Sequence, residues 1–146
     1  MRTVVLVGTL LVAAPAMAAA QEKQVIRLPG SLEGLPFSTA VRVGNVIYLS
    51  GQVGVPSGSR ELVAGGVGPE TRQTLENIRR VLEHAGSSLD RVVKCTVFLA
   101  DIADYQAMNE VYRTFFPKDP PARSTVAGSG LALGARVEIE CIALAG

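Results

Sequence analysis

The sequence predicts an α+β fold in which one β-sheet is covered on one face by two helices. Segments with strand and helix character follow one another in the order β-β-α-β-α-β-β. Connections that pass through a helix favour parallel pairing of the strands they join, so we expect a mixed sheet. The chain has 146 residues, 48% of them hydrophobic and 18% charged, which suits one globular domain.

The N-terminus has the pattern of a secretory signal peptide. Arg2 supplies the positive start, an apolar run follows, and small residues at Ala18 and Ala20 offer two cleavage positions. The run is too short for a membrane span of about 20 residues, so cleavage is favoured over an uncleaved anchor. We therefore expect a signal peptide over residues 1–20, one domain over residues 21–146, and a secreted or periplasmic location.

A tight hairpin is the first recognisable element of the domain. The β-rich runs 41–43 and 46–50 are separated only by Gly44-Asn45, a pair that tolerates positive φ. Residues 51–70 are rich in glycine, proline and serine, which predicts a loop before the first helix.

Two amphipathic helices follow. Pro69 suits the first turn of a helix and Gly86 the position after its end, whereas Asp101 suits the N-cap of the second helix and Pro117 ends it. Apolar residues recur at spacings of three and four in both segments. The two stripes are Leu75, Ile78, Leu82 and Ala85, and Tyr105, Met108, Tyr112 and Phe115.

Three further strands complete the predicted sheet, at residues 92–100, 122–127 and 137–144, with a glycine-rich loop at 128–134. Two helices can cover only one face of this sheet. The other face must be polar or must be buried against another chain, and small sheets of this kind often oligomerise.

Cys95 and Cys141 lie in two of the predicted strands. A disulfide between them could form in an oxidising compartment, but it requires a Cα separation that the sequence does not give. We favour two buried, unpaired thiols. With one histidine and no close Cys/His cluster, we expect no metal site.

The last strand carries two carboxylates on one face, Glu138 and Glu140. This face is either solvated, or paired with structural arginines, or lined with an acid that performs acid–base work. Arg123 follows two prolines that stiffen the backbone, so its guanidinium could clamp a planar carboxylate or form a salt bridge to Glu138. Taken alone, these residues favour the structural interpretation.

Several motifs occur in a fixed order: VRVGNVIYLSGQVGV, a long segment that includes NEVY, then PPARSTV, then ARVEIECIAL. Over residues 36–144 the chain resembles the RidA/YjgF family of reactive-intermediate deaminases. The resemblance implies a chorismate-mutase-like fold, a relative of the ferredoxin-like fold, with a mixed sheet packed on two helices. It also implies a homotrimer in which three sheets form a central barrel and three clefts lie between subunits.

The resemblance further implies hydrolysis of 2-imino acids, or of enamines such as 2-aminoacrylate, to 2-keto acids and ammonia, with no metal or organic cofactor. Arg123 would clamp the substrate carboxylate and Glu138 would activate water. The remaining substrate-binding positions implied by the resemblance are Phe37, Ser50, Gly51, Asn109, Tyr112 and Thr125. Phe37 stands where many active relatives have tyrosine, and Thr125 where cysteine is common.

Two alternatives remain at this stage. The same cleft could bind a small carboxylate without turnover, which the missing hydroxyl at Phe37 favours, or the trimer surface could serve as an interaction platform. The formal net charge is +1, and without Arg2 the chain has 13 basic and 13 acidic residues. We therefore expect no nucleic-acid partner and no stable membrane association after cleavage.

Overall fold

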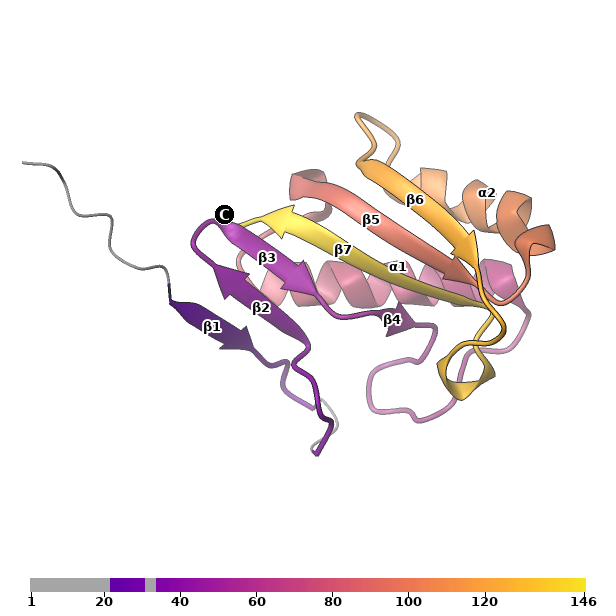
Figure 1. The fold of residues 1–146 in the computed structure, drawn as a ribbon, viewed down its shortest axis with the longest axis horizontal. Helices are drawn as coiled ribbons and strands as arrows, with labels where there is room; N and C mark the ends of the chain where they lie inside the picture. Colours follow the sequence, from indigo (N-terminus) through magenta and orange to yellow (C-terminus); the bar gives the residue numbers. More distant parts are fainter. Residues whose placement is uncertain (1–21, 31–33) are drawn as a thin grey trace, which may run out of the picture.

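The computed structural model describes residues 22–30 and 34–146 and confirms the α+β class. One mixed sheet has the strand order β1-β2-β3-β7-β5-β6, with β4 paired to β7, and both helices lie behind the same face (Figure 1). The strands are β1 (Lys23–Ile26), β2 (Ala40–Val43), β3 (Val46–Leu49), β4 (Gln52–Val53), β5 (Val92–Leu99), β6 (Ala122–Ala127) and β7 (Val137–Leu144). The helices are α1 (Val67–His84) and α2 (Tyr105–Phe115). The predicted signal peptide lies outside the described residues and stays a prediction.

The predicted hairpin is formed by β2 and β3, and Gly44 at its turn has φ of 57°. Two strands were not predicted. The short strand β4 interrupts the segment expected as a loop and pairs with β7, while β1 adds an exposed edge to β2. Both are too short to show an alternating pattern, so pairing partners rather than local sequence determine them.

Both helices follow the predicted stripes. In α1, Leu75, Ile78 and Leu82 are fully buried, and Gly86 closes the helix with φ of 73°. Asp101 does accept a hydrogen bond from the Ala103 N–H, but it caps a 3₁₀ turn (Ile102–Asp104) that precedes α2. Across the described ranges, no helix is both long and apolar enough to cross a membrane.

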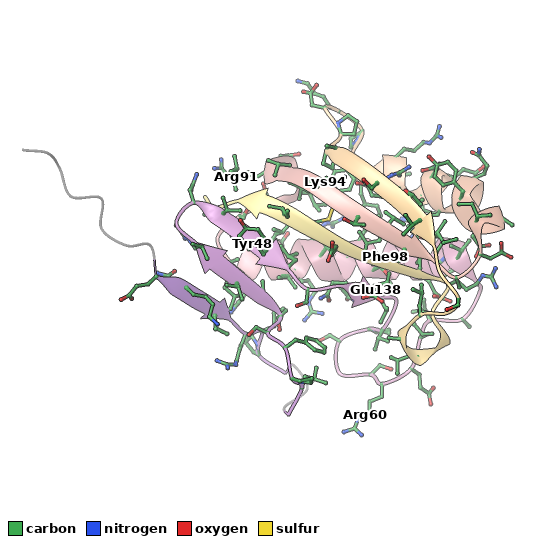
Figure 2. All side chains as sticks on the ribbon, viewed as in Figure 1. Tyr48, Arg60, Arg91, Lys94, Phe98 and Glu138 are labelled. Atoms are coloured by element: carbon green, nitrogen blue, oxygen red, sulfur yellow. A yellow bond between two sulfur atoms is a disulfide. The ribbon has the colours of Figure 1, made fainter. Side chains whose placement is uncertain are left out.

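The two faces of the sheet differ. On the helix face, the strands contribute the buried core, including Ile47, Val97 and Ile139. Figure 2 shows Tyr48, Lys94, Phe98 and Glu138 on the opposite face. That face is neither fully polar nor covered, because it exposes large apolar side chains. These are Val25, Tyr48, Val126 and Leu144.

The favoured interpretation of the cysteines as unpaired thiols is wrong, because the structure joins Cys95 to Cys141. The antiparallel register of β5 and β7 places the two residues directly opposite each other, on the buried face. The register between β5 and β7 could not be read from the sequence, and it is this register that allows the two cysteines to form a disulfide.

Removal of this disulfide should destabilise the fold. The bridge spans 46 residues, so its loss from the Cys95→Ala/Cys141→Ala double variant should lower the free energy of unfolding by about 2–4 kcal/mol. Denaturant unfolding with and without reductant measures this change. Reductant should lower the midpoint of the parent but not that of the double variant, and an equal response from both proteins would contradict the assignment.

Candidate active site

Arg123 projects from β6 toward helix α2, where aromatic rings hold its guanidinium. The guanidinium carbon lies 4.6 Å from the centre of the Tyr112 ring and 5.7 Å from that of Tyr105. One terminal nitrogen donates to the Tyr105 hydroxyl at 3.3 Å. Hydrogen bonds with Asn109 and then Arg123 lower the pKa of Tyr105 below its usual value. These contacts orient the guanidinium without neutralising it.

The ion pairs of the described residues join Arg79 to Glu76 and Arg136 to Asp104, and none of them involves Arg123. The salt bridge to Glu138 that we considered as a structural role is not formed. The guanidinium instead lines a cavity of about 430 Å³ beside α2. The cavity is lined by Asn109, Tyr112, Arg113, Phe116, Pro120, Pro121 and Arg123, which include two cations and no acid.

Two buried hydroxyls near this guanidinium lack a hydrogen-bond partner among the described residues. They are the phenol of Tyr112, whose ring lies under Arg123, and Oγ1 of Thr125, two residues further along β6. Burial raises the pKa of Tyr112 to about 12, despite the opposing charge of Arg123, so its hydroxyl stays protonated and can donate. An unsatisfied buried polar group costs about 1–3 kcal/mol, which favours a polar ligand beside it.

Glu138 lies on the other face of the sheet, in β7, against the backbone of Gly51. A side chain at Gly51 would overlap the Glu138 carboxylate, so only glycine permits this approach. Burial raises the pKa of Glu138, and the negative charge of Glu140 raises it further. We expected Gly51 to admit a ligand, whereas the structure shows it admitting this carboxylate.

The sheet therefore separates the two predicted catalytic groups. Arg123 is in register with Cys95, on the face that packs against the helices, whereas Glu138 is in register with Phe98, on the face turned away from them (Figure 2). A single chain does not bring Arg123 and Glu138 into one cavity. A cleft that contains both requires a second copy of the chain.

The remaining predicted residues divide between the two regions. Asn109 and Tyr112 lie beside Arg123, as expected. The Ser50 hydroxyl donates to the Ser38 carbonyl at 2.6 Å, so it ties the end of β3 to the segment that contains Phe37. Phe37 is exposed over 58% of its surface and stands apart from the Arg123 cavity.

The sequence analysis missed three neighbours of Arg123. Tyr105 and Met108 contact its guanidinium, and Arg113 shares its cavity. Tyr105 and Met108 were assigned only to the apolar stripe of the helix. The spacing of three and four that places Tyr105 and Met108 on one side of α2 also makes them face β6, where Arg123 lies. This spacing was the feature of the sequence from which their contact with Arg123 could have been predicted.

The fold is a two-layer α+β arrangement, and beside α2 it carries a cleft whose lining residues include two arginines and no acid. The chain matches the family described as Endoribonuclease L-PSP over residues 32–145 and belongs to that family, the RidA/YjgF family that its motifs resemble. It is 47% identical over 111 residues to 2-iminobutanoate/2-iminopropanoate deaminase of Mus musculus, covering 76% of this chain and 82% of the relative. The human protein of the same name is 42% identical over 120 residues, 82% of this chain and 86% of the relative.

Solved structures agree with this assignment. RidA from an Antarctic Psychrobacter has a TM-score of 0.78 and 38% identity, covering 83% of this chain and 98% of that one. Yeast Mmf1 has a TM-score of 0.79 and 30% identity, covering 86% of this chain and 100% of that one. The fold expected from the resemblance is thus confirmed for the single chain.

The secreted or periplasmic location that we expected is wrong. The chain is 47% identical over 113 residues to Protein mmf2, mitochondrial, of Schizosaccharomyces pombe, which covers 75% of this chain and 88% of the length of that relative. It is 41% identical over 108 residues to Reactive Intermediate Deaminase A, chloroplastic, of Arabidopsis thaliana, which covers 74% of this chain and 58% of the length of that relative. Both names refer to organelles. Our expectation depended only on the composition of residues 1–20, which lie outside the described part of the chain.

Removal of the Glu140 charge should lower the pKa of Glu138. The Glu140→Gln variant eliminates a like charge on the same face, so the Glu138 carboxyl should titrate at lower pH than in the parent. A pH titration of side-chain carboxyl carbons by NMR measures the shift. Glu83→Gln, on the exposed surface of α1, is the matched control and should leave the Glu138 titration unchanged. A Glu138 pKa that is the same in all three proteins would contradict the electrostatic coupling.

Proposed function

We propose that the protein hydrolyses 2-imino acids and their enamine tautomers, such as 2-aminoacrylate, to 2-keto acids and ammonia. The observation that carries this proposal is the Arg123 guanidinium, which aromatic rings orient in a cavity lined by no acid. A planar fork of this kind matches a carboxylate. The names of the relatives at 42% and 47% identity supply the reaction.

The substrate carboxylate binds Arg123, which fixes the position of the imine carbon. This carbon is already electrophilic, so no covalent intermediate with the protein is needed. Glu138 accepts a proton from water as the oxygen attacks and the C=N bond becomes a single bond. Return of this proton to the former imine nitrogen gives the neutral carbinolamine. Glu138 then takes the proton of the carbinolamine hydroxyl and passes it to nitrogen, so the C–N bond breaks and ammonia leaves as the C=O bond forms.

The proposal requires a homotrimer, or another closed assembly, because Arg123 and Glu138 lie on opposite faces of the sheet. In the trimer, the exposed apolar face around Tyr48, Val126 and Leu144 becomes buried between subunits. The cleft between neighbours then receives Arg123 from one chain and Glu138 from the next. Figure 2 shows the sheet face of the single chain on which Glu138 lies.

Loss of either group should abolish most of the activity. Arg123→Ala removes the clamp, and Glu138→Gln removes the base while preserving its shape, so each should lower kcat/KM by about 100-fold or more. The assay generates 2-iminopropanoate or 2-iminobutanoate in situ with an amino-acid oxidase and follows release of the keto acid.

Arg80→Gln is the control for this experiment, because Arg80 is an exposed arginine on α1 whose guanidinium donates to the Ser57 hydroxyl at 3.0 Å and does not line the Arg123 cavity. It should retain parental kinetics. Parental activity in Arg123→Ala would contradict the clamp. If the parental protein binds keto acids but does not accelerate imine hydrolysis, the result would support the alternative in which the cleft binds a small carboxylate without turnover. The missing hydroxyl at Phe37 favours that alternative.

Co-expression of the two inactive variants should restore activity. Arg123→Ala subunits retain Glu138, and Glu138→Gln subunits retain Arg123, so mixed trimers contain some intact clefts. Random assembly in equal amounts should return about a quarter of the parental activity over the whole preparation, because each cleft draws one residue from each of two chains. Mixed trimers freed of homotrimers should show about a third, because one of their three clefts is intact. Measurement on the co-purified mixed trimer tests this.

The separately purified variants, mixed without exchange of subunits, provide the control and should stay inactive. No recovery in mixed trimers of confirmed composition would place both groups in one chain's site, which would contradict the proposed shared cleft.

A further inference from the structure

We propose that the cleft binds dicarboxylates in preference to monocarboxylates, so that its substrates include 2-imino dicarboxylic acids. This inference rests on the proposed function for its chemistry, but not for its binding test. It depends on Arg113, a second guanidinium that lines the same cavity of about 430 Å³ as Arg123. The cavity therefore offers two carboxylate-binding groups.

Arg113 is anchored at one end and free at the other. It lies one helical turn after Asn109 in α2, and its Nε donates to the Asn109 carbonyl at 3.3 Å. This bond directs the side chain along the helix toward the cavity that Asn109 also lines. The ion pairs formed within the described residues involve other arginines, so the terminal nitrogens of Arg113 are not engaged by an acid there.

The charge of the cavity favours a dianion. Arg113 and Arg123 contribute two positive charges, while the other lining residues are an asparagine, two aromatic residues and two prolines. A monocarboxylate bound to Arg123 leaves the second guanidinium unpaired beside an apolar wall. A second carboxylate on the same ligand can pair with it at little additional loss of freedom, because the first contact already fixes the ligand.

The size of the preference follows from exposure. Arg113 is exposed to solvent, so its ion pair with a ligand belongs to the weak class. We expect succinate to bind about fivefold more tightly than butanoate, which has the same number of carbons and one carboxylate. The difference in affinity between succinate and butanoate should decrease as the salt concentration rises, because salt screens the interaction between exposed charges.

Calorimetry with succinate and butanoate tests the inference on the intact assembly. In Arg113→Gln the dissociation constants of succinate and butanoate should converge, whereas Arg80→Gln should keep the parental difference between them. The proposal would be overturned if the parent bound succinate and butanoate with equal affinity, or if Arg113→Gln kept the parental preference for succinate. Neither result depends on whether the protein is catalytic.

The kinetic experiment compares 2-iminosuccinate, generated by an aspartate oxidase, with 2-iminobutanoate. The ratio of kcat/KM for 2-iminosuccinate to kcat/KM for 2-iminobutanoate should exceed one in the parent and fall about fivefold in Arg113→Gln, whereas Arg80→Gln should keep the parental ratio. If 2-iminobutanoate is hydrolysed and 2-iminosuccinate is not preferred, the dicarboxylate inference fails and the proposed function stands. If neither imine is hydrolysed but succinate binds through Arg113, the proposed function fails alone.

Discussion

The positive charge of Arg123 is the feature on which the site depends. The protein holds this guanidinium with the rings of Tyr112 and Tyr105 and with the Tyr105 hydroxyl, and not with a carboxylate. A carboxylate from the same chain would satisfy the charge permanently and exclude an anionic ligand. Aromatic faces fix its position and leave its outward hydrogen-bonding capacity to a ligand.

The second constraint is the sheet itself, because it divides the chemistry. Side chains alternate between faces along each strand, so the pairing register decides that Arg123 faces α2 and Glu138 faces away. A single subunit therefore carries two half-sites and an exposed apolar face that includes Tyr48 and Leu144. Under the proposed function, assembly of copies through that face would bury the apolar surface and bring Arg123 of one chain near Glu138 of another.

The local elements of this fold could be predicted from the sequence, and its long-range relations could not. Gly44-Asn45, Gly86 and the strand over residues 122–127 carry strong local signals, and the structure places them as expected. The strand β4 and the disulfide between Cys95 and Cys141 depend on which strands pair and in what register. The candidate site residues came from the resemblance. The separation of Arg123 and Glu138 onto two faces, and the positions of Tyr105 and Arg113 beside Arg123, depend on how strands and helices pack and could not be predicted from the sequence.

The placement of Arg123 and Glu138 on opposite faces of the sheet affects the pKa of Glu138. If Arg123 and Glu138 met directly, each would hold the other, and the ion pair would lower the pKa of the carboxyl. Instead, burial beside Gly51 and the nearby Glu140 raise the pKa of Glu138. A carboxylate with a raised pKa is a better proton acceptor from water and still returns the proton to the departing nitrogen. In the proposed mechanism, Arg123 and Glu138 of one chain do not pair with each other, so the guanidinium remains available to a substrate carboxylate and the carboxylate to a proton.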